Sequence, residues 1–109
     1  MTRLPYSAPD TARSYDVRVD IAALPGADLI ADGIADLRAG RETLSALLVS
    51  IGSRRLAAAG VDVPPPLPDP EHRLYSLLSR EDSDSAHGRY NALVRRLVSF
   101  ERAAECVAP

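Results

Sequence analysis

Three polar residues near the end of the chain are spaced for one face of a helix. His87, Asn91 and Arg95 follow one another at intervals of four residues, and residues four apart are neighbours on a helix surface. Imidazole exchanges a proton near neutral pH, and guanidinium binds phosphates and carboxylates. This stripe predicts a pocket for a small anion, with Asn91 and Arg95 as ligand-binding residues.

Arg80 precedes His87 with six residues between them. In a small helical chain, this pair resembles the motif of the HEPN superfamily, an arginine and a histidine separated by four to six residues. That superfamily includes bacterial toxin ribonucleases and partners of small nucleotidyltransferases. The resemblance implies a metal-independent ribonuclease or an inactive relative, working as a homodimer with the motifs near the dimer cleft. Arg80 would then stabilise the scissile phosphate of RNA, and His87 would aid attack by the 2′-hydroxyl.

Acidic residues recur on an earlier predicted helix, where Asp28, Asp32 and Asp36 are four residues apart. Like charges at this spacing repel one another unless arginines or a cation such as Mg²⁺ compensate them. We interpret the three as a solvated face, and we expect no metal and no cofactor. The single cysteine, Cys106, allows neither an internal disulfide nor a multi-cysteine metal site.

The charge composition is unusual because all 13 basic residues are arginine, against 15 acidic ones, for a net charge of −2. This balance disfavours binding of nucleic acid by net charge but allows a local basic patch. Six arginines are candidates for such an anion-binding patch: Arg54, Arg55, Arg89, Arg95, Arg96 and Arg102.

The elements that must position these residues are mostly helical. Apolar residues recur at three- and four-residue intervals, and Asp28 is a suitable N-cap for the first helix. Gly52, inside the second predicted helix, indicates a bend or a close helix contact. The segment 64–70 is a proline-rich connector, either a stiff spacer or a ligand for a proline-reading domain. The pattern predicts helices over about 28–39, 42–59, 70–80 and 84–105.

The beginning of the chain has a different pattern. Residues 1–14 have no apolar period and are interpreted as a flexible arm. Residues 15–21 alternate between apolar and charged side chains, which predicts a β-strand. Because a lone strand leaves backbone groups unpaired, it must pair with the short strand-like piece 60–63, lie across the helices, or pair with the same strand of a second copy, and we favour the last. The predicted fold is therefore all-α, a small four-helix bundle over 15–109 with an extended arm and one short strand.

With 109 residues, the chain has the length of one domain. It shows neither a membrane span nor the apolar run of a signal peptide, so we expect a cytoplasmic protein. Three functional hypotheses remain open. The first is a non-catalytic interaction or regulatory module that forms a homodimer and has a possible protein partner. The second is the HEPN-like ribonuclease, for which RNA would be the partner. The third is a sensor of small anionic ligands.

Overall fold

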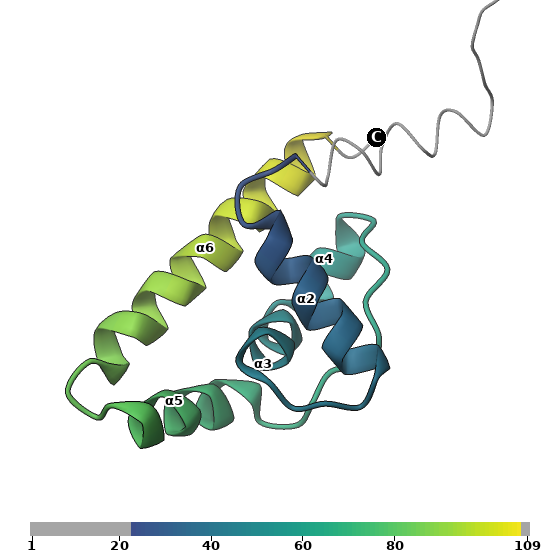
Figure 1. Ribbon diagram of the computed structural model, residues 1–109. Helices are drawn as coiled ribbons and strands as arrows, with labels where there is room; N and C mark the ends of the chain where they lie inside the picture. The colour runs from purple at the N-terminus through teal and green to yellow at the C-terminus, as the bar shows by residue number, and fades with distance from the viewer. Residues whose placement is uncertain (1–22, 108–109) are drawn as a thin grey trace, which may run out of the picture.

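The structure is a computed structural model that describes residues 23–107. These residues form helices and no strand, which confirms the all-α class. The predicted four-helix bundle is not confirmed, and the predicted arm at 1–14 and strand at 15–21 lie outside the described residues. In chain order the helices are α2 (Ala27–Arg38), α3 (Leu44–Ile51), α4 (Ser53–Ala58), α5 (Pro70–Glu81) and α6 (Ala86–Val107) (Figure 1).

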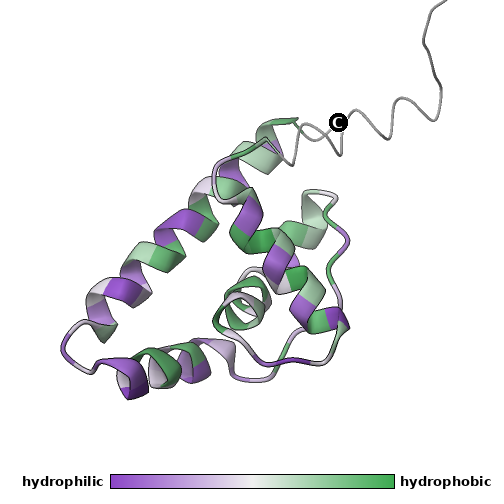
Figure 2. Ribbon diagram, in the orientation of Figure 1, coloured by the Kyte–Doolittle hydropathy of each residue, from purple (hydrophilic) through white to green (hydrophobic). Residues whose placement is uncertain are grey.

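Helix α3 lies at the centre, with α2, α5 and α6 around it (Figure 1). Its residues Ala46, Leu47, Leu48 and Val49 follow one another in sequence, and all are fully buried. A helix that is apolar on every side needs partners on every side. The surrounding helices carry polar residues on their outer faces, as Figure 2 shows for α5 and α6.

Helices α2 and α3 pack closely because glycine occupies the point where they meet. A Cβ added at Gly33 would overlap the carbonyl oxygen of Ser45 and a methyl group of Val49, and would lie 2.8 Å from the Ser45 carbonyl carbon. Ile30, one turn earlier on α2, is buried in the same core. The missing side chain therefore allows α2 to approach α3 at backbone distance.

The helix predicted over 42–59 is two helices, α3 and α4, separated at Gly52. This glycine is buried against α6, where an added Cβ would lie 2.9 Å from Leu97 Cδ1 and 2.5 Å from Glu101 Oε2. Thr43 is the N-cap of α3, and its hydroxyl accepts a hydrogen bond from the Ala46 N–H. The sequence indicated a bend or a close contact at Gly52, and the structure shows both.

The proline-rich connector runs from α4 to α5 along the surface of α3. Leu67 N–H donates to Ser50 Oγ over 3.0 Å, and the Leu67 side chain packs against the core. The buried Ser50 hydroxyl donates in turn to the Ala46 carbonyl. The connector is thereby attached to α3, as a spacer between helices would be. Asp69 then turns into α5 with a positive φ of 48°, and Pro70 begins the helix.

Helices α5 and α6 are joined by the short turn 82–85. Leu74 and Leu78 of α5 and Leu97 and Phe100 of α6 are buried in the shared core. An ion pair of 2.9 Å between Arg89 and Glu81 connects the two helices across the turn. Among residues 23–107, no helix combines the length and the apolar character needed to cross a lipid bilayer.

Candidate functional site

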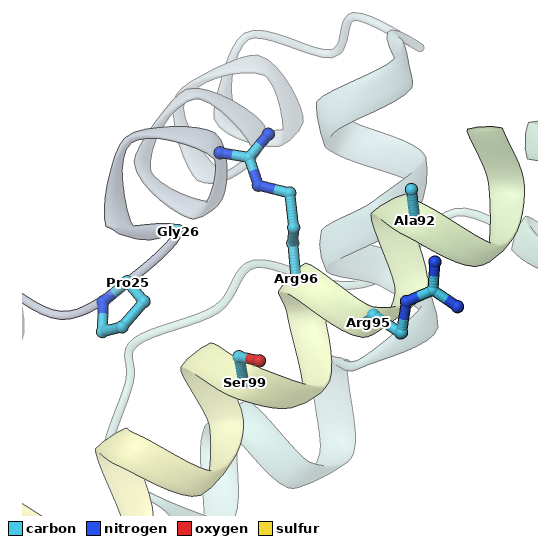
Figure 3. A pocket seen from close by; sticks show the side chains of 6 residues that line it. All are labelled: Pro25, Gly26, Ala92, Arg95, Arg96 and Ser99. Atoms are coloured by element: carbon cyan, nitrogen blue, oxygen red, sulfur yellow. The ribbon is translucent and has the colours of Figure 1, made fainter.

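A hollow of about 300 Å³ lies between the start of α2 and the middle of α6 (Figure 3). We call it the α2–α6 hollow. It is lined by Pro25 and Gly26 before α2 and by Ala92, Arg95, Arg96 and Ser99 on α6. Its volume is at the lower end of the range of small-ligand sites, which is roughly 300 to 1,000 Å³.

The backbone at Gly26 brings the start of α2 against α6. Gly26 has a φ of 79°, in the left-handed region that favours glycine. An added Cβ would lie 3.4 Å from the carbonyl oxygen of Arg96 and 3.8 Å from Phe100 Cβ. Glycine therefore allows both the turn into the helix and the close approach that forms one wall of the hollow.

Two backbone N–H groups at the N-terminus of α2, beside this wall, have no acceptor within residues 23–107. Its N-cap, Gly26, has no side chain that could accept a hydrogen bond. The N–H of Ala27 donates to Leu24 O and that of Ile30 to Gly26 O, whereas the N–H groups of Asp28 and Leu29 donate to none of the described residues. Free amides at a helix start carry partial positive charge and attract anions.

Arg95 and Arg96 add two full positive charges to the hollow. Both side chains are exposed, and neither has a carboxylate partner among residues 23–107. Ser99 contributes a hydroxyl (Figure 3). Five other arginines in the same part of the chain are ion-paired: Arg38, Arg41, Arg55, Arg73 and Arg89. The hollow therefore has the donors and the positive charge to bind a phosphate or a carboxylate.

The predicted stripe of His87, Asn91 and Arg95 is only partly one site. His87 Nε2 and Asn91 Nδ2 are 3.2 Å apart and both side chains are exposed, but only Arg95 lines the hollow. Each four-residue step turns the side-chain direction by about 40° around an α-helix. After two such steps, the Arg95 side chain points about 80° around α6 from that of His87, and therefore closer to the direction of Arg96.

His87 lies instead beside the ring of Tyr75, which also packs against Tyr90, at the junction of α5 and α6. The centroid of Tyr75 is 6.4 Å from that of His87 and 5.6 Å from that of Tyr90. Burial, together with the charge of Glu71, raises the pKa of Tyr90. The imidazole thus contacts the Asn91 amide and lies near the Tyr75 ring.

Arg80 and His87, the pair of the HEPN resemblance, lie on either side of the turn 82–85. Arg80 is in the last turn of α5 and His87 in the first turn of α6, and both side chains are exposed. The structure shows no hydrogen bond between them, and neither lines the α2–α6 hollow. The two are close along the chain without being joined in one site within residues 23–107.

Sequence reasoning missed the wall supplied by Pro25 and Gly26, and it did not single out Ser99. Arg96 was included only in a broad basic patch. That patch is divided in the structure, because Arg55 and Arg89 are ion-paired while Arg95 and Arg96 line the hollow. A glycine just before a predicted helix start is the one signal that could have indicated an uncapped terminus.

Arg55 belongs to a separate ionic group between α4 and α6. Its guanidinium is 2.6 Å from Glu105 and 3.3 Å from the buried Glu101. Burial raises the pKa of Glu101, although the nearby Arg55 partly opposes this effect. The hydrogen bond from Arg55 lowers the pKa of Glu105. Arg55 therefore connects α4 to α6 through two ion pairs.

The three acidic residues of the repeat on α2 have different surroundings. Asp36 accepts hydrogen bonds from the Thr43 hydroxyl at 2.6 Å and from Arg41 at 2.9 Å, and these bonds lower its pKa. Asp28 and Asp32 are exposed, and Asp28 lies in the first turn of α2 instead of at the predicted N-cap. Within the described residues, no group of three or more potential ligands could hold a metal ion.

No model of a known protein family matches the chain, and neither a curated protein nor a solved structure does, so its function has to be inferred from the geometry of its own residues.

Proposed function

We propose that this chain is a non-catalytic regulatory module that binds a small anionic ligand in the α2–α6 hollow. The observation that carries the proposal is that Arg95 and Arg96, which have no carboxylate partner within residues 23–107, lie beside the start of α2, where the N-cap Gly26 has no side chain. The other lining groups are a proline ring, two small residues and the Ser99 hydroxyl. They can position an anion, but they supply no general base that could take the proton from an attacking hydroxyl or water.

Binding of inorganic phosphate tests this function. Phosphate also stabilises proteins nonspecifically, through exclusion from their surface, so the signal is a saturable rise in Tm at constant ionic strength. A ligand at ten times its Kd stabilises the fold by about 1.4 kcal/mol. We expect this rise in the wild type and its loss in Arg96→Gln. The matched control is Arg54→Gln, which removes an exposed arginine outside the hollow.

If the wild type and Arg96→Gln respond identically to phosphate at every concentration, the hollow does not bind anions and the proposal is wrong. Acetate at equal ionic strength serves as the carboxylate probe in the same assay. Isothermal titration calorimetry then gives the stoichiometry, for which we expect one anion-binding site per chain.

The homodimer and the cytoplasmic location expected from the sequence belong to the same proposal. The alternating apolar and charged residues over 15–21 support an interface built by strand pairing. Sedimentation equilibrium at micromolar concentration should give twice the chain mass of 11.7 kDa. A monomer under these conditions would exclude the paired strand, and cell fractionation tests the location.

A second candidate function is the HEPN-like, metal-independent ribonuclease. It is favoured by one observation: the His87 imidazole is exposed and oriented by Asn91, with the exposed Arg80 at the other side of a short turn. Purified protein should then cleave RNA in the presence of a chelator. Arg80→Ala and His87→Ala should each abolish cleavage, while Arg54→Ala retains it. If no cleavage occurs, or if both variants remain active, the chain is not such an enzyme.

A further inference from the structure

The two arginines of the α2–α6 hollow do not point to the same place. Figure 3 shows the guanidinium of Arg96 reaching toward the start of α2, while that of Arg95 extends the other way, on the side of Ala92. Successive residues on a helix project about 100° apart, which accounts for this divergence. A bidentate clamp on one carboxylate or phosphate needs its donors to converge, so the pair does not form one.

The other residues that line the hollow are small or apolar. Pro25, Gly26 and Ala92 carry no side-chain donor or acceptor, and Ser99 supplies the one hydroxyl of the lining. The space of about 300 Å³ is much larger than a single phosphate or carboxylate group needs. The hollow thus has two guanidiniums that point in different directions, and the rest of its lining carries no charge.

We infer that the ligand is a compact organic dianion with its two anionic groups at opposite ends of a short uncharged spacer. This inference rests on the proposed anion-binding function and specifies its ligand class. One anionic group pairs with Arg96 beside the start of α2, and the other pairs with Arg95. Dicarboxylates and phosphorylated carboxylates share this chemistry.

Calorimetric titration with matched probes tests the inference. Adipate carries two carboxylates at the ends of a chain, butyrate carries one, and inorganic phosphate concentrates its charge in one group. We expect adipate to bind at least tenfold more tightly than butyrate or phosphate. Titration with 5-phosphonopentanoate, which has the same four methylenes as adipate, distinguishes a phosphorylated ligand from a dicarboxylate, because the two probes differ only in the second anionic group.

Single substitutions of the two arginines test each proposed contact by itself. Arg95→Gln and Arg96→Gln should each reduce the affinity for adipate to that for butyrate, and Arg54→Gln should leave it unchanged. If phosphate or butyrate binds as tightly as adipate, or if Arg95→Gln leaves adipate binding intact, the two-ended ligand is wrong while anion binding stands. If no anion binds saturably, the proposed function fails as well.

Discussion

Replacing Gly33 by alanine is a direct test of the packing that places α2 over the core. The added methyl group would overlap the Ser45 carbonyl oxygen and Val49, and would lie 2.8 Å from the Ser45 carbonyl carbon. Most of these atoms belong to the backbone of α3, which cannot rotate away as a side chain can. Helix α2 must therefore move off α3, and Ile30 moves with it.

The expected magnitude follows from two opposing effects. Overpacking a core costs about 1 to 3 kcal/mol, and a clash with backbone belongs at the upper end. Replacing glycine by alanine within a helix stabilises the helix by about 1 kcal/mol. The net loss in the free energy of unfolding is about 2 kcal/mol, which lowers the Tm of a domain this small by roughly 8 to 16 °C.

The assay is urea unfolding followed by circular dichroism, with calorimetry for the Tm. Gly88→Ala is the matched control, because Gly88 is also inside a helix, α6, but has nothing within 4 Å of an added Cβ. We expect this control to be as stable as the wild type, or up to about 1 kcal/mol more stable. A Gly33→Ala variant as stable as the Gly88→Ala control would refute the close approach of α2 to α3.

Two further predictions concern buried polar groups. Ser50→Ala removes the acceptor of the Leu67 N–H and should lower the free energy of unfolding in urea by about 1 to 3 kcal/mol. Amide exchange at Leu67 should also become faster. The control Ser79→Ala removes no hydrogen bond within residues 23–107 and should leave the stability nearly unchanged. Burial raises the pKa of Glu101 in the folded state. The folded protein therefore binds a proton at Glu101 more tightly than the unfolded chain does, and this proton binding stabilises the fold at low pH. The stabilisation is lost as the pH rises through the folded pKa. The stability of Glu101→Gln minus that of the wild type should therefore increase with pH across that window, and a difference that stays constant or decreases would contradict the raised pKa.

The positions of the helices could be predicted from local pattern, because apolar period and stop signals act within a few residues. The last helix illustrates this: residues 84–105 were predicted and Ala86–Val107 were found. The separation of α3 from α4 could not be predicted in the same way. It depends on Leu97 and Glu101, which approach Gly52 from α6, more than 40 positions later in the chain.

For the candidate site, even less could be predicted from local pattern. The spacing of His87, Asn91 and Arg95 grouped three residues of α6, of which only Arg95 lines the α2–α6 hollow. The partners of an arginine also lie far along the chain, as for Arg55, which contacts Glu105 50 positions later. Local pattern cannot show which arginines remain unpaired.

The sequence by itself determined the all-α class, the approximate extent of the helices and the abundance of arginine over lysine, because composition and periodicity are local properties. Only the tertiary structure decided which arginines are ion-paired and which line the hollow. It paired Arg55 and Arg89 with acids and brought the uncapped start of α2, through Gly26, against Arg95 and Arg96. The physical reason is that charge pairing and helix contact depend on distance in space, which the packing of α2 and α6 sets.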